Sequence, residues 1–146
     1  MNNKEKYEYW LEAAKYDLET AKVMIDGGRY VYVAFMCQQS IEKLTKGIYT
    51  LYTGDEPPRI HNIWALFKEL ERKDDFIEVI NLDDYEENLE KYKSFLAELL
   101  SFYISGRYPN YKQKMSSLIN RDRAKRILEN TEEAFKWIES LSLYKE

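Results

Sequence analysis

The chain has 146 residues, of which 45% are hydrophobic and 33% are charged, and its formal net charge is −4. This composition excludes a chain that is disordered throughout, and the length fits a single domain, residues 1–146, with a sizeable core. The five glycines and three prolines are few for this length, so we expect long regular elements joined by few turns.

The first element in chain order is an amphipathic helix. Over Tyr7–Ile25, apolar or small residues recur at alternating spacings of four and three, which is the pattern of a bundle helix with one apolar stripe. We expect Gly27 and Gly28 to end this helix in a tight turn, because glycine accepts the left-handed conformation that is common at helix C-termini.

A second long helix is predicted over Tyr30–Leu51, where the same stripe continues. Pro57 and Pro58 cannot lie inside a helix, so the segment TGDEPPRIHN is predicted to be a loop. A short amphipathic helix, Ile63–Leu70, is expected to follow it.

A third long helix is predicted over Tyr85–Tyr103, where the stripe returns. Asp83 or Asp84, followed three residues later by a glutamate, resembles a capping box at the start of this helix. Gly106 and Pro109 are expected to end it.

The last helix is predicted over Ala124–Leu141, with Asn120 as its N-cap. The sequence contains no strand pattern and no internal repeat. The expected fold is therefore all-α: an up-and-down four-helix bundle with one additional short helix packed on its side or end.

Cysteine, histidine and the N-terminus bear on location and cofactors. Cys37 is the only cysteine, so no internal disulfide can form, and we expect it to be a small core residue. The N-terminus has no signal-peptide core, and the longest apolar run, YVYVAFMC, is too short to span a membrane. We therefore expect a cytoplasmic protein with no membrane contact. With a single histidine and no Glu-x-x-His pair, we expect no metal site and no cofactor.

Charge is unevenly distributed along the chain. Residues 69–90 carry ten acids and two bases, whereas residues 105–126 carry seven bases and one acid. Such asymmetry favours one surface for a negatively charged partner. The alternative is a pair of solvated faces that neutralise each other within a dimer.

Five polar residues interrupt an apolar part of the second helix: Gln38, Gln39, Glu42, Lys43 and Lys46. Glu42 precedes Lys46 by four residues, which is the favourable order for an ion pair on a helix. Periodicity alone favours a mixed surface stripe beside the core stripe. The alternative is a buried or half-buried polar network that fixes the register of the helices and borders a site.

Several features, spread over nearly the whole chain from about Tyr7 to Leu141, match one known family. They are Trp10, Ala13, Asp17-Leu18 and Ala21, the turn GRY, the segment QQSIEKLTKG, His61 with Leu66, the segment SGRYPNY, and Ala124 with Ala134. This combination resembles the HEPN domain, a helical module. The resemblance implies a five-helix layout, a homodimer, and polar partners on neighbouring helices for the cluster on the second helix. Asp17 is then the expected partner of Gln39, Lys43 or Lys46.

The resemblance also implies candidate catalytic residues. HEPN ribonucleases use an Arg-x4-6-His motif that both subunits of a dimer contribute. Here Arg107 stands at the arginine position, but Lys112 stands where the histidine is expected. Histidine transfers protons near neutral pH, whereas lysine is a poor general base there. The motif is therefore degenerate, and Arg107, Lys112 and His61 are the weak candidates for any remaining catalysis.

Basic and aromatic residues alternate in the segment after the third long helix. Arg107, Lys112 and Lys114 are suited to binding phosphates, and Tyr103, Tyr108 and Tyr111 to stacking on nucleobases. In the alternative interpretation, the segment is a connecting loop whose tyrosines pack on the bundle and whose Arg107 caps helix carbonyls.

His61 also has two interpretations. In one, it is a proton shuttle or a phosphate contact. In the other, it is a structural residue at a helix N-terminus near the proline loop.

Together these observations predict a non-catalytic HEPN-type binding module. Its ligand would be a nucleotide or RNA, or its partner a separately encoded nucleotidyltransferase in a toxin–antitoxin-like system. A metal-independent endoribonuclease toxin and a purely structural interaction protein are the alternatives.

Overall fold

The computed structural model describes residues 1–105, 107–108 and 111–145. Its four long helices are α1 (Asn3–Asp26), α2 (Tyr30–Thr53), α5 (Leu82–Ser105) and α6 (Arg121–Ser140). Its shorter elements are α3 (Ile63–Glu71), α4 (Asp74–Ile77) and the 3-10 turns η1 (Met115–Ser117) and η2 (Leu141–Tyr144). These described residues contain no strand, which confirms the all-α prediction.

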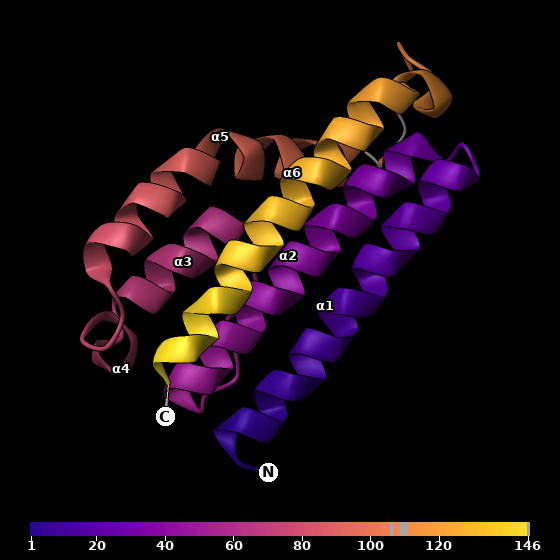
Figure 1. Ribbon diagram of the computed structural model, residues 1–146. Helices are drawn as coiled ribbons and strands as arrows, with labels where there is room; N and C mark the ends of the chain where they lie inside the picture. Colours follow the sequence, from indigo (N-terminus) through magenta and orange to yellow (C-terminus); the bar gives the residue numbers. More distant parts are fainter. Residues whose placement is uncertain (106, 109–110, 146) are drawn as a thin grey trace.

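Helix α2 is the centre of the bundle. It contacts α1, α3, α4, α5 and α6, and Figure 1 shows α1 on one side of it and α3 and α5 on the other. Because other helices surround it, α2 buries polar side chains as well as its apolar stripe. The buried polar residues of α2 are Gln38, Ser40, Glu42, Thr45, Lys46 and Thr50.

Helices α1 and α2 form a closely packed antiparallel pair. A Cβ atom added at Gly47 would lie 2.7 Å from the Cβ atom of Trp10, which is closer than two carbon atoms can approach. At the turn between the helices, Gly28 has a φ of 71°, and the backbone N–H of Arg29 donates to the carbonyl of Met24 at 2.8 Å. The predicted glycine turn is therefore confirmed.

Asparagine side chains start all four helices for which a side-chain cap is seen among the described residues. In each case the amide oxygen accepts a hydrogen bond from the backbone N–H three residues further on, which satisfies a donor that the helix leaves unpaired. The four caps are Asn2, Asn62, Asn81 and Asn120. Asn120 is the residue that the sequence predicted.

The start of α5 differs from the prediction. Asn81, rather than Asp83 or Asp84, is the cap, because its side chain accepts from the backbone N–H of Asp84 at 3.1 Å. Both aspartates lie inside the first turn, where a carboxylate interacts favourably with the positive end of the helix dipole. At the other end, α5 stops at Ser105, and the predicted stop residues Gly106 and Pro109 lie outside the described residues.

Helix α4 is a single turn that periodicity does not predict. Its Phe76 is fully buried and lies edge-on to Tyr52, with ring centroids 5.0 Å apart, and to Tyr85, at 5.4 Å. A four-residue helix is too short to show a periodic pattern. Its position is instead set by one aromatic side chain that reaches two long helices.

The two charged segments lie at opposite ends of α5. The acidic segment, residues 69–90, covers the end of α3, all of α4 and the start of α5, whereas the basic residues follow the end of α5 and begin α6 (Figure 1). A helix of 24 residues is about 36 Å long. The fold thus keeps the acids far from the basic segment instead of pairing them within one chain.

Candidate functional site

A buried ion pair on α2 is the foundation of the candidate site. Lys46 Nζ lies 3.0 Å from Oε2 of Glu42, one helical turn away. The side chains of Glu42 and Lys46 are only 5% and 11% exposed, so this is not a solvated surface pair. Two buried charges are tolerated when each has a close partner of opposite sign.

His61 reaches the same carboxylate from the loop before α3. Its Nδ1 atom lies 3.1 Å from Oε1 and 3.2 Å from Oε2 of Glu42. An ionised carboxylate can only accept, so Nδ1 carries the proton in this contact and Nε2 is left for another partner. The amide of Gln38 donates to the backbone carbonyl of His61 at 2.6 Å, which holds the loop on α2. The His61 side chain remains 51% exposed.

Tyr103 of α5 joins His61 to Arg107. The ring centroids of His61 and Tyr103 are 5.2 Å apart, and Phe35 stacks on Tyr103 at 5.1 Å. Nη1 of Arg107 donates to the Tyr103 hydroxyl at 2.8 Å, and the guanidinium carbon lies 5.2 Å from the ring centroid. We call Glu42, Lys46, His61, Tyr103 and Arg107 the His61 cluster. It gathers residues from α2, the loop before α3, α5 and the segment after α5.

The predicted polar network of α2 is divided between two places. Gln38, Glu42 and Lys46 belong to the His61 cluster or hold it, whereas Lys43 pairs with Asp17 across the seam between α1 and α2, with Nζ 2.7 Å from Oδ2. Gln39 is partly exposed. Asp17 is 6% exposed, so its pair with Lys43 is a largely buried link between the two helices.

The remaining predicted ligand residues lie on the surface after α5. Tyr108 is 64% exposed and Tyr111 is 97% exposed, and the side chains of Lys112 and Lys114 are also exposed. Neither tyrosine is packed in the bundle. Of the predicted residues in this segment, the structure brings Arg107 to the His61 cluster and leaves the others facing solvent.

An apolar groove lies beside the His61 cluster, between α3 and α5. Its volume is about 430 Å³, and it begins at Asn62, the residue after His61, and runs along α5 to Ile104, the residue after Tyr103. Trp64 forms one wall, with Lys68 Nζ 4.6 Å and Lys93 Nζ 5.0 Å from its ring centroid. Trp64 is partly buried against the core, and its ring with the two lysines over it borders the groove.

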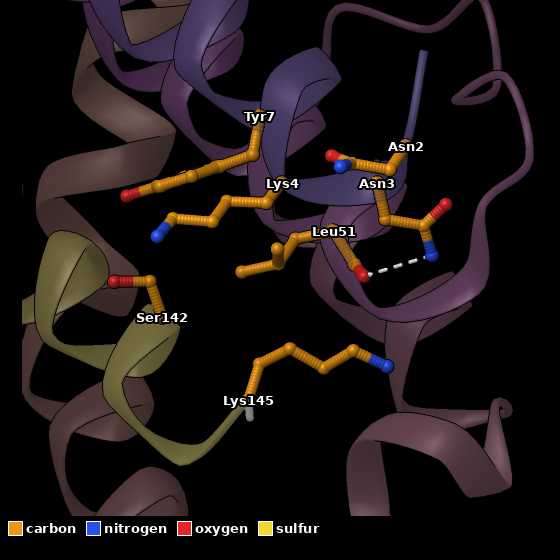
Figure 2. A pocket seen from close by; sticks show the side chains of 7 residues that line it. All are labelled: Asn2, Asn3, Lys4, Tyr7, Leu51, Ser142 and Lys145. Atoms are coloured by element: carbon orange, nitrogen blue, oxygen red, sulfur yellow. Dashed lines mark hydrogen bonds between the residues drawn. The ribbon is translucent and has the colours of Figure 1, made fainter.

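A second cavity, of about 400 Å³, lies between the start of α1 and the C-terminal turn. Figure 2 shows Tyr7 and Lys4 on one wall, with Ser142 and Lys145 on the other. The residues that line it are Asn2, Asn3, Lys4, Tyr7, Leu51, Ser142 and Lys145. None of them was predicted as a site residue, and the cavity shares no residue with the His61 cluster.

Thiol and metal chemistry have little support in the described residues. Cys37 is fully buried, and burial raises the pKa of its thiol to about 12, so the nucleophilic thiolate is suppressed. The described part of the chain holds no group of three or more His, Cys, Asp or Glu side chains that could bind a metal ion.

Sequence reasoning missed two parts of the site. Tyr103 was predicted both as a member of an apolar stripe and as one of the tyrosines suited to stacking on nucleobases, but nothing in its spacing marks it as the residue that touches both His61 and Arg107. The contact between His61 and Glu42 was also missed, although Gln38 and Glu42 lie one turn apart on the face of α2 that the loop covers. The spacing of Gln38 and Glu42, one helical turn apart, is a signal for Glu42, but nothing in the sequence indicates that His61 is its partner.

The fold and the site define a class of protein: an all-α bundle with an arginine after its third long helix and a polar cluster on its second. The family model described as HEPN domain matches residues 7–141. The chain therefore belongs to the HEPN domain family, as the resemblance indicated. Comparisons with curated proteins and with solved structures gave no significant match. Within the described residues, no helix is both long enough and apolar enough to cross a membrane.

Proposed function

We propose that this HEPN protein binds the phosphate groups of a nucleotide or RNA at the His61 cluster, without cleaving its ligand. The observation that carries the proposal is that His61 and Arg107, far apart in the sequence, both lie against Tyr103 and both have exposed side chains. The Arg107 guanidinium is suited to an anionic oxygen, and so is the His61 imidazole when it is protonated, because Nε2 then also donates while Nδ1 donates to Glu42.

The groove between α3 and α5 supports the choice of a ligand with a base as well as a phosphate. Its wall is Trp64, with Lys68 and Lys93 over the ring. Any nucleobase can stack on an aromatic face, and nearby lysines attract the phosphates of the nucleic-acid backbone. The groove is lined by Asn62 and Ile104, the residues that follow His61 and Tyr103, so a base held in the groove would bring its phosphate toward the cluster.

Charge placement supports the same site. The acids of residues 69–90 are at the far end of α5, so they do not repel a phosphate at the His61 cluster.

The proposed function excludes cleavage because residue 112 is a lysine. Binding a phosphate in its ground state requires only positive charge, whereas cleavage also requires a group that exchanges a proton near neutral pH. Lys112 replaces the histidine that the family motif carries at this position.

The experiment that tests the proposal is a titration of labelled single-stranded RNA with the purified protein at low and high salt. We expect binding that weakens steeply with salt and is lost in Arg107→Ala. The matched control is Arg72→Ala, an exposed arginine in the acidic segment, which should bind RNA as the wild type does. No binding even at about 50 mM salt, where phosphate contacts are strongest, would leave only a protein-partner role.

A second candidate function, a metal-independent endoribonuclease, is favoured by one observation. His61 lies within 3.2 Å of both oxygens of Glu42, the arrangement in which a carboxylate orients an imidazole for proton transfer. His61 would then take the role of the missing motif histidine. Prolonged incubation with labelled RNA decides between the two functions, since cleavage that is lost in both His61→Ala and Arg107→Ala would replace the non-catalytic proposal.

We also propose a cytoplasmic homodimer and, as the partner that the family resemblance suggests, a separately encoded nucleotidyltransferase in a toxin–antitoxin-like pair. Light scattering should report about twice the chain mass of 17.6 kDa. A species of single-chain mass at high micromolar concentration would remove the dimer from the proposal.

A further inference from the structure

Helix α1 carries an exposed apolar row on its outer side. Tyr9, Tyr16 and Val23 are 65%, 75% and 64% exposed. They are seven residues apart, so they lie on one side of the helix, almost directly above one another. Single exposed apolar residues are common, but three large ones aligned on one helix form a continuous surface.

Two further rows flank this apolar row. Glu5, Glu12 and Glu19 each come four residues before one of its members, so they form an acidic row along one flank. Ala13 and Thr20 come four residues after Tyr9 and Tyr16 and form a flank of small, partly exposed side chains. Acids line one side and small residues the other, which is the layout of a helix that receives a second helix.

The fold leaves this side of α1 uncovered. Helix α1 lies at the edge of the bundle (Figure 1), and it packs chiefly against α2 and to a lesser extent against α6. The residues that it turns inward include Tyr7, Ala14 and Ala21, on the side opposite the apolar row. Among the described residues, Tyr9, Tyr16 and Val23 are not part of the hydrophobic core or packed against it.

The acidic flank is largely uncompensated. Glu19 is paired with Lys22 at 3.0 Å, but Glu5 and Glu12 of the acidic row, and Glu8 beside it, make no ion pair within the described part of the chain. Two further bases lie beside the flank: Lys15, which is directed to Glu139 of α6 at 3.4 Å, and Lys4, which lines the cavity at the start of α1. A partner that supplied positive charge along this flank would satisfy three carboxylates that are otherwise only solvated.

We propose that this face of α1 is a docking surface for a basic amphipathic helix of another protein. The apolar residues of that helix would lie on Tyr9, Tyr16 and Val23, and its lysines or arginines would lie along the row of glutamates. The three apolar residues span about 21 Å at 1.5 Å per residue, which matches a partner segment of about two heptads. A contact of this size belongs to the weak, reversible class of interfaces.

A second copy of this chain fits the face poorly. An antiparallel two-fold pairing of α1 with itself places each flank against the same flank of its copy, so the glutamates would face one another. A parallel pairing would place the glutamates against Ala13 and Thr20, which carry no charge. Neither arrangement supplies the positive charge that the flank lacks. The face is also separate from the His61 cluster, because none of its residues contributes to that site.

The test uses the full chain and two dye-labelled synthetic peptides of 21 residues. Both carry leucines at heptad spacing, but one has lysines on its flanks and the other has glutamates. By fluorescence anisotropy at low salt, we expect the lysine peptide to bind at least about tenfold more tightly than the glutamate peptide, with the difference reduced at high salt. Equal binding of the two peptides, or none of the lysine peptide, would overturn the proposal.

Variants locate the binding on α1. Tyr16→Ser should weaken binding of the lysine peptide about tenfold, whereas Leu143→Ser, which changes an apolar residue that is 82% exposed elsewhere, should leave it unchanged. Reversing the flank with Glu5→Lys and Glu12→Lys should transfer the preference to the glutamate peptide. If Tyr16→Ser instead halves the mass of the protein in light scattering, the face belongs to a second copy and the proposal fails.

Discussion

Nδ1 of His61 lies 3.1 Å from Oε1 of Glu42, so a half-exposed imidazole in a loop is joined to a carboxylate on the central helix whose side chain is 5% exposed. The same carboxylate accepts from Lys46. Glu42 therefore has two tasks: it neutralises a buried lysine, and it orients the one histidine of the chain. A change at Glu42 should affect both stability and ligand binding, whereas a change at His61 should affect mainly the second.

Removing the carboxylate of Glu42 should destabilise the fold. Glu42→Ala leaves Lys46 buried without its ion-pair partner, so we expect a loss of about 1–4 kcal/mol in the free energy of unfolding, measured by urea denaturation. The control is Glu69→Ala, which removes an exposed pair with Arg72 and should change stability by less than about 1 kcal/mol. Equal effects of the two substitutions would show that the Glu42–Lys46 pair is as solvated as a surface pair.

Adding a methyl group at Gly47 should also be destabilising, although alanine is the better helix former. The new Cβ atom would lie 2.7 Å from Trp10 Cβ, and relieving this clash requires α1 and α2 to separate. We expect Gly47→Ala to cost about 1–3 kcal/mol in the free energy of unfolding, which exceeds the gain of about 1 kcal/mol in helix propensity. Gly27→Ala is the control, because its nearest neighbour would be 3.6 Å away. An unchanged or raised stability of Gly47→Ala would contradict the close packing.

The fold should lose stability in alkali. Burial raises the pKa of the Tyr7, Tyr52 and Tyr85 hydroxyls and raises the pKa of the Cys37 thiol to about 12. The unfolded chain deprotonates first, at about pH 8.5 for cysteine and about pH 10 for tyrosine. Above these values unfolding releases protons, so stability decreases by up to about 1.4 kcal/mol per pH unit for each such group. Below about pH 8, these groups contribute no pH dependence.

Tyr85 offers the clearest check of this alkaline effect. Its hydroxyl donates to Glu71 at 2.9 Å, and Tyr85→Phe removes a titrating group while keeping the ring. We expect the variant to be less stable at neutral pH, but its stability should decline less steeply between about pH 10 and about pH 11. Thermal unfolding measured across this pH range tests the expectation. An unchanged slope would show that Tyr85 titrates equally in the folded and unfolded states.

The thiol of Cys37 should be protected in the native protein. It is fully buried and its pKa is raised to about 12, so a thiol reagent should label it only when the bundle opens or unfolds. We expect no labelling at neutral pH over minutes and complete labelling in denaturant. Mass spectrometry detects the added mass of the label. Rapid labelling of the native protein would indicate that the seam around Cys37 opens readily.

The regular parts of this protein follow from its sequence. The spacing of apolar residues identifies the four long helices and α3, since a repeat of 3.6 residues places a stripe on one face of each helix. Gly28 marks the turn, and Asn120 marks the start of α6. Each of these features depends on residues within a few positions of one another, so the local sequence is enough to predict them.

The site and the least regular elements were decided by the tertiary structure. Periodicity alone favoured a solvated stripe for Glu42 and Lys46, and only the resemblance to the HEPN domain favoured a buried or half-buried network. Both residues are buried, because whether a polar flank of a helix meets water depends on how many helices surround it. Helix α4 is placed by the contacts of Phe76. Asn81, Asp83 and Asp84 could each cap α5 by their residue type, and the structure shows that Asn81 does so. His61, Tyr103 and Arg107 are separated by long stretches of chain, and only the packing of α5 against α2 brings them together. Local patterns carry no information about such contacts, since their geometry depends on where entire helices end and cross.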